Sequence, residues 1–537
     1  MKPHLLFHER DAGLDVSYSG LNGFTVEAPP LPWGSDDLAQ DLGLVPLLQA
    51  MAQGDVIIFE VAKQALFNPL LSADAITYRQ EILADCIAHP GVFREIYEIG
   101  REAIRGEHEV WRPWGNHPNS LLDRSVTVLD IFLALLKQLR RVADENATKA
   151  RSQGMTEFFA MLVRELDEPY FATVAGHLER LKFKAGSLMS ARLGSASRGT
   201  DYVLRSPRNA KPSFRERVGL DPPNSASFQL APRDEAGSRY LSELKDRGLN
   251  LVANALAQST DHITSFFKLL VSEVGFYVGC LNLAAHLSHG NRPICRPYVK
   301  SGGSPALSFR GIYDVSLALR SEGTVVGNDA SADLKTLVMI TGANSGGKST
   351  LLRSMGLAQV MMQAGMFVGA EAFSANLCHA VFSHFIREED EMMTSGKLDE
   401  ELARMSAIVE RIGPGDLILF NESFAATNER EGSEIAYQVV TALLETGVKV
   451  MFVTHQFTLA NRLYQQHGVP AMFLRAERGE AGIRTYKLVE APPLSTSFGE
   501  DLFEQMGGWN TTASRLAVAP RVNATDSARS NGSAESP

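Results

Sequence analysis

The chain has 537 residues, which is too many for a single hydrophobic core, so two to four domains are expected. Apolar residues make up 45% and charged residues 21%, as in ordinary soluble proteins, and the polar first residues predict no signal peptide. Four widely spaced cysteines without a C-x-x-C pair argue against a disulfide framework or a zinc site, and fit a cytoplasmic protein. The net charge of −10 does not favour a nucleic-acid partner, but it leaves room for a local basic surface.

The first half of the chain is predicted to be mostly helical. Residues 1–40 are rich in Gly, Pro and Asp, which predicts an irregular lead-in or a short strand. Residues 41–300 form the helical region, because apolar residues recur there at helical spacings. Residues 120–150 and 156–183 each predict one long helix, and long helices resume at about residue 235 and continue to 288.

One stretch of the helical region is apolar enough to raise the question of a membrane span. Residues 263–287 are the most apolar part of the chain, but Lys268, Glu273 and His286 interrupt them. A membrane span of this length tolerates few such groups. We therefore expect a buried helix and no membrane partner.

A locally basic segment, residues 180–217, lies between the predicted helices. It holds ten lysines and arginines against two acidic residues, Asp201 and Glu216. A solvated loop explains this composition as well as a nucleic-acid surface does, so composition alone leaves both interpretations open.

The second half of the chain has a different sequence pattern. Residues 301–510 alternate short apolar runs, such as 337–341, 417–420 and 448–453, with helical segments. Strand–helix–strand alternation predicts a parallel sheet in an α/β domain. Residues 511–537 are mostly small and polar, and are expected to form a disordered tail. The fold class is therefore multidomain, with a mostly helical region followed by an α/β domain.

A glycine-rich segment between the first of these strands and the next helix matches G-x-x-x-x-G-K-[ST]. In this pattern backbone N–H groups wrap phosphates, the lysine reaches the β- and γ-phosphates, and the last hydroxyl ligates Mg²⁺. The helix that follows directs its N-terminal dipole at the anion. We expect a nucleotide site for ATP and Mg²⁺ made by Gly342, Ala343, Asn344, Ser345, Gly346, Gly347, Lys348, Ser349 and Thr350.

Polar residues at the ends of two further strands are candidates for the same site. Asn421 and Glu422 follow the strand 417–420, where nucleotide sites usually carry two acidic residues. Asn421 can accept a hydrogen bond from a metal-bound water but brings no charge, while Glu422 is the candidate base that orients the attacking water. His455 follows the strand that ends at residue 453 and can sense a γ-phosphate, although a polar residue satisfied at a strand end explains it too.

Together these segments resemble the MutS family. The run 340–353 is similar to the MutS phosphate loop, including its Asn, its double Gly and the Arg in the following helix. Shorter segments at 326–329, 363–370, 452–455 and 486–488 also resemble family segments. The resemblance is strong from about 305 to 508 and weaker upstream, where residues 68–82 look like the start of the MutS core domain.

The resemblance implies an ABC-like P-loop ATPase domain that uses ATP and Mg²⁺. Lys348, Glu422 and His455 would be its catalytic residues, and Ser349 and Asn421 would lie at the metal. Since most of the family has Asp where this chain has Asn421, fast hydrolysis is not expected.

The resemblance also implies a DNA-binding lever and a homodimer. The long helices would be the levers, and the basic segment would fall near the lever tip, where relatives carry a clamp that touches DNA. We therefore expect Arg205, Arg208 and Lys211 to contact DNA phosphates. The family's signature loop completes the partner subunit's site, and here it would include Ser395 and Gly396.

The expected function is ATP-regulated DNA binding with slow hydrolysis, in DNA repair or recombination, on mismatched or branched DNA. Post-replicative mismatch recognition is not expected, because the core-like region begins too near residue 1 for a mismatch-reading domain to precede it. One alternative is a nucleotide-binding scaffold with little or no hydrolysis, which the substitution at Asn421 favours. Another is an ABC-type ATPase that acts on other partners, which the absent L-S-G-G-Q signature disfavours.

Overall fold

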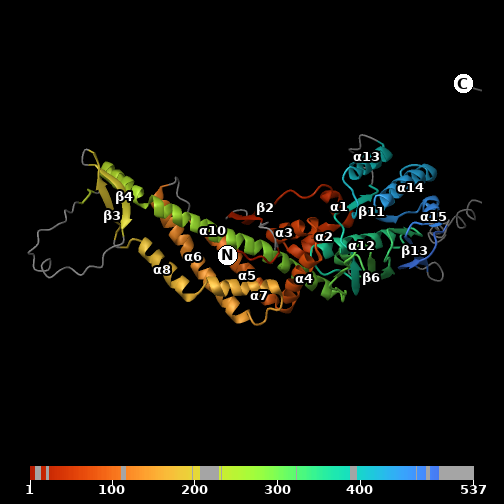
Figure 1. The fold of residues 1–537 in the computed structure, drawn as a ribbon, viewed down its shortest axis with the longest axis horizontal. Helices are drawn as coiled ribbons and strands as arrows, with labels where there is room; N and C mark the ends of the chain where they lie inside the picture. Colours follow the sequence, from red (N-terminus) through yellow and green to blue (C-terminus); the bar gives the residue numbers. More distant parts are fainter. Residues whose placement is uncertain are drawn as a thin grey trace, which may run out of the picture.

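The structure is a computed structural model of an elongated molecule (Figure 1). A helical arm forms one end, and an α/β region forms the other. The predicted tail of residues 511–537 and the basic segment beyond Arg205 lie outside the residues that the structure describes. These are 1–6, 14–19, 23–110, 117–184, 186–195, 198–205, 229–231, 233–321, 323–387, 396–466, 468–478 and 484–494.

The N-terminal segment is more regular than the sequence predicted. It contains an antiparallel pair, β1 (Asp15–Ser19) and β2 (Gly23–Glu27), followed by helix α1 (Ser35–Leu42). Val16 of β1 and Leu42 of α1 are completely buried in the main core. Of the two alternatives predicted for residues 1–40, the structure has the short strand, as a pair, and adds helix α1.

The helical region is built around one very long helix, α10 (Glu235–His289). It packs against α2, α3, α5 and α6 and runs along the arm (Figure 1). By length and composition α10 would qualify as a membrane span, but 89% of its apolar window is buried inside the protein, as expected of a core helix. The other helices are α2 (Leu44–Ala52), α3 (Val56–Phe67), α4 (Ala73–Ala88), α5 (Pro90–Glu109), α6 (Pro118–Asn146), α7 (Gln153–Glu165) and α8 (Glu168–Leu181).

The single helix predicted for residues 156–183 is two helices, α7 and α8. Leu166 leaves the helical conformation, with φ −109° and ψ 55°. Asp167 then caps α8 by accepting a hydrogen bond of 2.7 Å from the Tyr170 N–H, and Pro169 occupies the first turn. The apolar spacing continues across this break, so periodicity alone did not reveal it.

The far end of the arm carries an antiparallel hairpin, β3 (Leu188–Leu193) and β4 (Gly199–Arg205). β4 packs against α10, and the hairpin lies at the opposite end of the molecule from the α/β region (Figure 1). The described part of the basic segment therefore belongs to the end of the arm.

The predicted parallel sheet is confirmed in the α/β region. Its strand order is β10-β11-β12-β8-β13-β14, with the first five strands parallel and β14 antiparallel. The strands are β8 (Leu337–Thr341), β10 (Val381–Phe385), β11 (Leu417–Asn421), β12 (Lys449–Val453), β13 (Ala471–Arg478) and β14 (Arg484–Glu490). The helices are α11 (Val315–Arg320), α12 (Lys348–Gln363), α13 (Lys397–Val409), α14 (Glu429–Glu445) and α15 (Phe457–Gln465).

A smaller four-stranded sheet accompanies the main one. Its order is β5-β9-β6-β7, from β5 (Tyr298–Val299), β6 (Leu307–Ile312), β7 (Asn328–Ser331) and β9 (Ala372–Ala375). Buried polar contacts join the α/β region to the helical region. Gln363 at the end of α12 donates to the Leu70 carbonyl, and Arg79 of α4 donates to the Ala364 carbonyl.

Candidate functional site

Three parallel strands bring most of the candidate residues to one edge of the main sheet. The register pairs Ile340 of β8 with Val453 of β12, and Val453 with Asn421 of β11. In open α/β sheets, ligands bind outside the carboxyl ends of the strands. The segment after β8, Glu422 after β11 and His455 after β12 therefore meet at the edge where a ligand is expected.

The segment between β8 and α12, residues 342–349, is called the glycine loop below. Gly342 and Gly347 adopt φ values of 113° and 90°, which residues with side chains rarely adopt. Gly346 is required for a different reason, since a Cβ there would lie 2.7 Å from the Ala476 Cβ of β13. Ser345 is left-handed as well, with φ 56°. Where residues of left-handed and right-handed backbone conformation follow one another, successive N–H groups point into one concavity that can bind an anion.

The remaining loop candidates differ in exposure. Asn344 and Ser345 are exposed, whereas Ala343 and Thr350 are half-buried. Thr350 lies in the first turn of α12, next to Ser349.

Lys348 is a buried cation at the N-terminus of α12. Its side chain donates hydrogen bonds to the carbonyl oxygens of Gly342 (2.9 Å) and Ala343 (3.1 Å). The pKa of Lys348 is lowered, because the effect of burial exceeds the opposing effect of the Glu422 charge. Because a buried charge is costly unless it is paired, an anion above the glycine loop would stabilise this ammonium. The site therefore fits a phosphate-bearing ligand.

Ser349 and Asn421, the candidate metal residues, are in direct contact. The Ser349 hydroxyl donates a hydrogen bond of 2.8 Å to the Asn421 Oδ1. Hydroxyl and amide oxygens are among the hard donors that suit Mg²⁺. Within the described residues no three His, Cys, Asp or Glu side chains gather as a metal site. The pair therefore fits a Mg²⁺ that takes further ligands from phosphate oxygens and water.

Glu422 and His455 lie beside each other at the same edge. The Glu422 Oε2 and the His455 Nδ1 are 3.8 Å apart, and both side chains are partly exposed. The Glu422 carboxylate is thus accessible to solvent, and it is close enough to Lys348 for its charge to act on the pKa of that lysine. This arrangement suits a carboxylate that orients a water molecule.

The turn that carries Glu422 has an unusual backbone. Glu422 and Phe424 have φ values of 55° and 62°, on either side of Ser423. Each left-handed residue of this kind costs about 1–3 kcal/mol and persists only where its surroundings hold it. The Glu422 N–H donates to the Val453 carbonyl (2.9 Å), and the Gln456 side chain donates to the Phe424 carbonyl (3.1 Å). Sequence reasoning missed this turn, because no residue type at these positions signals a positive φ.

Asn328 and Arg353, which the sequence indicated only through the resemblance to a family, have structural roles near the glycine loop. The Asn328 side chain donates to the Tyr486 carbonyl (3.2 Å) and accepts from the Leu488 N–H (2.8 Å), so it ties β7 to β14. Arg353 of α12 pairs at 2.9 Å with the fully buried Asp314, which caps α11. These contacts hold β14 and α12 in place beside the glycine loop.

The candidate signature loop is described only at its end. Ser395 lies outside the described residues, and Gly396 is exposed at the N-cap of α13. Glu401, the other recognisable residue of this segment, is 4% exposed on α13. Gly396 is therefore accessible, as a contact with a second subunit requires.

The DNA-binding candidates lie on or beyond the hairpin. Arg205 is exposed on β4 and donates to the Ser190 hydroxyl (2.8 Å), while Arg208 and Lys211 fall outside the described residues. Lys182 pairs with Asp130 (2.9 Å), and both Lys182 and Lys184 bond to Glu179. These cations lower the pKa of Glu179 to about 2. The net positive charge of the basic segment is therefore smaller in the folded protein than its sequence suggests, because the carboxylates of Asp130 and Glu179 pair with Lys182 and Lys184.

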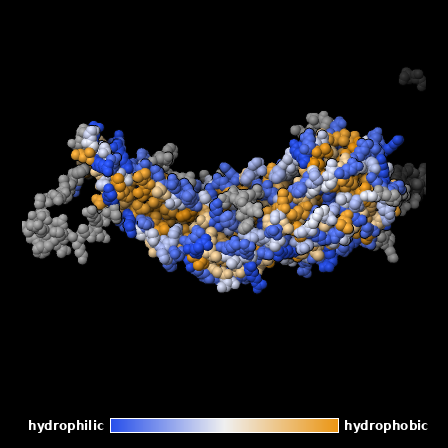
Figure 2. All heavy atoms as spheres, in the orientation of Figure 1, coloured by the Kyte–Doolittle hydropathy of each residue, from blue (hydrophilic) through white to orange (hydrophobic). Residues whose placement is uncertain are grey.

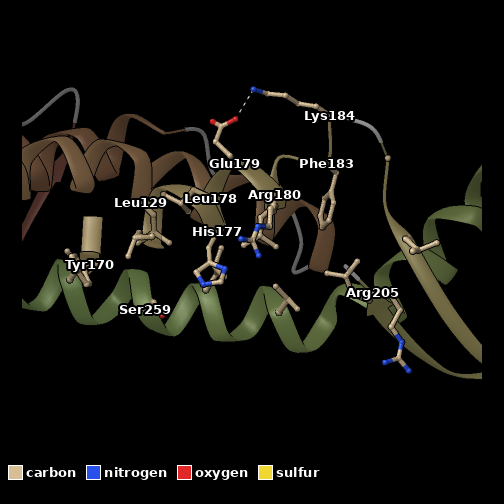
Figure 3. A pocket seen from close by; sticks show the side chains of 18 residues that line it. Leu129, Tyr170, His177, Leu178, Glu179, Arg180, Phe183, Lys184, Arg205 and Ser259 are labelled. Carbon is tan, nitrogen blue, oxygen red and sulfur yellow. Dashed lines mark hydrogen bonds and ion pairs between the residues drawn. The ribbon is translucent and has the colours of Figure 1, made fainter. Parts of the chain in front are cut away.

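An apolar cavity lies beside these cations. It has a volume of ≈ 800 Å³ and is lined by residues of α6, α8, the hairpin and α10 (Figure 3). Leu129 and Leu178 line it, and so do Lys184 and Glu179, which bond to each other on the side away from α10 (Figure 3). Apolar residues also gather on the outer face of the arm (Figure 2), and Leu193 is 80% exposed. The arm thus offers apolar as well as basic surface.

Sequence comparisons match both halves of the molecule. Residues 71–290 match the family described as MutS2 N-terminal domain, and they cover most of the helical region and the hairpin. Residues 338–509 match MutS domain V, and they include the glycine loop and the strand ends at the site. The fold thus consists of a helical arm and an α/β region that carries the candidate site. The chain belongs to the MutS family.

Individual relatives agree with this membership. The DNA mismatch repair protein MutS of Lactobacillus helveticus is 28% identical over 440 residues, which are 74% of this chain and 50% of that protein. MutS protein homolog 4 of Mus musculus is 26% identical over 351 residues, 64% of this chain and 35% of that protein. Endonuclease MutS2 of Thermus thermophilus is 31% identical over 169 residues, 31% of this chain and 23% of that protein. The chain therefore spans half or less of these relatives.

Proposed function

We propose that this protein is an ATP-regulated DNA-binding protein that acts in the cytoplasm, in DNA repair or recombination, on mismatched or branched DNA. The observation that carries the proposal is the contact between Ser349 and Asn421 below the glycine loop, with Glu422 and His455 at the same sheet edge. The names of the MutS relatives support the link to DNA repair.

The nucleotide chemistry would follow from the P-loop arrangement of the site. Lys348 would bind the β- and γ-phosphates, with the loop N–H groups around them. Ser349 and Asn421 would hold the Mg²⁺, which supplies positive charge to the phosphate oxygens. Glu422 would orient the attacking water, and His455 would contact the γ-phosphate. Hydrolysis is expected to be slow, because Asn421 contributes an oxygen without a negative charge.

DNA binding would belong to the end of the arm, where Arg205, Arg208 and Lys211 would meet backbone phosphates. In a homodimer, Ser395 and Gly396 would reach the nucleotide site of the second subunit. The exposed positions of Arg205 and Gly396 support these roles.

A gel-shift panel tests this proposal. Linear, mismatched and branched DNA would be titrated with wild type and Lys348→Ala, each with and without ATP. We expect wild type to bind at least one DNA form with an affinity that ATP changes, and Lys348→Ala to bind without that response. Absence of binding to every form at low salt would contradict the DNA-binding part. An unchanged ATP response in Lys348→Ala would contradict the nucleotide site.

A nucleotide-binding scaffold is the second candidate, and the uncharged Asn421 is the observation that favours it. A scaffold would bind ATP at the glycine loop without releasing phosphate. Equilibrium binding together with phosphate release at saturating ATP separates the two candidates.

A further inference from the structure

A buried histidine on a neighbouring strand contacts the strained turn that carries Glu422. His384 lies on β10, opposite Phe420 of β11, and is completely buried. A lone histidine in a short strand carries no motif, so nothing in the sequence indicates a role for it. Its surroundings give it two polar partners, Ser423 and Glu401, and two aromatic partners, Phe420 and Phe424.

The polar partners of His384 belong to two different elements. Its Nδ1 lies 2.8 Å from the Ser423 hydroxyl oxygen, and its Nε2 lies 3.0 Å from the carbonyl oxygen of Glu401 in α13. A carbonyl oxygen only accepts hydrogen bonds, so Nε2 carries the hydrogen. Burial, reinforced by the charge of Arg404, lowers the pKa of His384 to about 4. The ring is therefore neutral near pH 7, and the Ser423 hydroxyl lies between two acceptors, the Nδ1 of His384 and the backbone carbonyl oxygen of the same residue.

The stacked aromatic partner is Phe424, which lies on the other side of Ser423 from Glu422. Its ring stacks on His384 with centroids 5.3 Å apart and an interplanar angle of 20°, and it is completely buried. His384 thus holds Ser423 by a hydrogen bond and Phe424 by stacking. These two residues directly follow Glu422, so the imidazole helps to maintain the left-handed conformation of the turn.

We propose that His384 is a positioning residue for ATP hydrolysis, which holds the turn after β11 through Ser423 and so directs Glu422 toward the glycine loop. This role rests on the proposed function of Glu422 as the residue that orients water. Loss of the contact would let the strained turn relax and move the carboxylate. A displacement of about 1 Å can cost about a hundredfold in rate.

Two amide variants separate the two hydrogen bonds of His384. In His384→Asn the short side chain can keep an acceptor near the Nδ1 position for Ser423, but it loses the contact with Glu401. In His384→Gln the longer side chain can keep a donor for the Glu401 carbonyl. It loses the side-chain acceptor for Ser423, which is left with the backbone carbonyl of residue 384. We expect His384→Gln to lower kcat about tenfold to a hundredfold. We expect His384→Asn, which loses the stacking on Phe424 and the contact with Glu401 but keeps the acceptor, to lose less kcat than His384→Gln. Both variants should bind ATP as wild type does.

Ser423→Ala provides the second half of a double-mutant cycle. It should lower kcat at least as much as His384→Gln, because it also removes the bond from the Ser423 hydroxyl to the backbone carbonyl of residue 384. The double variant should lose no more than Ser423→Ala alone. Ser383→Ala is the matched control. Ser383 neighbours His384 but points to the opposite face of β10, toward Asp41 of α1, so kcat should not change. Melting temperatures of all variants report any general loss of stability.

Each outcome decides for or against the role of His384. Wild-type kcat in His384→Gln, or equal losses in the Asn and Gln variants, would overturn it, since the Ser423 contact would then not matter. Losses that fully add in the double variant would also overturn it. If wild type binds ATP but releases no phosphate, the proposed hydrolysis fails together with this role. Hydrolysis by wild type that is insensitive to His384→Gln overturns the positioning role alone.

Discussion

The two ends of the molecule present their candidate residues in different ways. At the sheet edge, Lys348 is buried and bonded to its own loop, and Ser349 is bonded to Asn421. At the end of the arm, Arg205 is exposed on a two-stranded hairpin and bonded to Ser190. The first site consists of buried contacts between strand ends, whereas the second consists of charge spread over a surface.

This difference predicts different sensitivities. When one partner of a buried hydrogen bond is removed, the other is left unsatisfied and its desolvation cost is no longer offset. Exposed ion pairs contribute only about 0–1 kcal/mol to stability and are screened by salt. Single substitutions at the sheet edge should therefore have large effects that depend little on salt. At the arm, effects should be small for each residue, additive and strongly dependent on salt.

The largest effect is expected for Glu422→Ala. Removal of the carboxylate should lower ATP turnover by about a hundredfold or more, while nucleotide binding persists. Phosphate release at saturating ATP and a nucleotide titration would measure the two quantities. Glu445→Ala, an exposed substitution at the end of α14, is the control. Wild-type turnover in Glu422→Ala would show that another group orients the water.

Lys348→Ala is expected to weaken nucleotide binding about tenfold or more, because it removes the cation of the glycine loop from the phosphates. The measurement is an equilibrium titration with ATP. Lys335→Ala is a suitable control, since this lysine precedes β8 at the other end of the strand. Equal affinities for wild type and Lys348→Ala would remove the nucleotide site from the loop.

Asn421→Asp should raise turnover several-fold. The aspartate has nearly the same shape, can still accept a hydrogen bond from Ser349, and adds the negative charge that usually anchors the Mg²⁺ shell. Turnover measured over a range of Mg²⁺ concentrations would detect both a faster rate and a lower metal requirement. If neither changes, the uncharged amide is not what limits hydrolysis.

The smallest effect per residue is expected at the arm. Replacement of Arg205, Arg208 and Lys211 by Ala should weaken DNA binding about equally across sequences. It should also flatten the log–log salt slope by roughly 0.9 for each lost phosphate contact on duplex DNA. Salt titrations of wild type and triple variant, with Arg310→Ala in the α/β region as control, would measure this. Superimposable curves would exclude DNA contact by these residues and favour the scaffold.

Particular residues show how far the sequence could lead. The parallel sheet and the glycine loop were predictable, because strand–helix alternation and the loop pattern depend on neighbours along the chain. The break at Leu166 was missed, since the apolar spacing continues through it. Within residues 1–40 a short strand was one of two alternatives, but its pairing with a second strand and helix α1 were not predicted. Such short elements give no clear period.

The candidate site divides in the same way. The sequence by itself indicated the glycine loop, the Asn421–Glu422 pair and His455 as candidate site residues, because each lies at or just after the end of an apolar strand. Only the tertiary structure decided which of them touch. Ser349 and Asn421 are 72 positions apart, and a parallel register brings them within 2.8 Å.

The tertiary structure also decided how charge and strain are distributed. The basic segment read as a run of ten cations, but Asp130 and Glu179 lie on separate helices and neutralise part of it. His384 belongs to no motif, and its proposed role depends on its contact with Ser423 in the strained turn after the adjacent strand. Local patterns are encoded by near neighbours, whereas contacts across strands and helices depend on packing that no short stretch of sequence specifies.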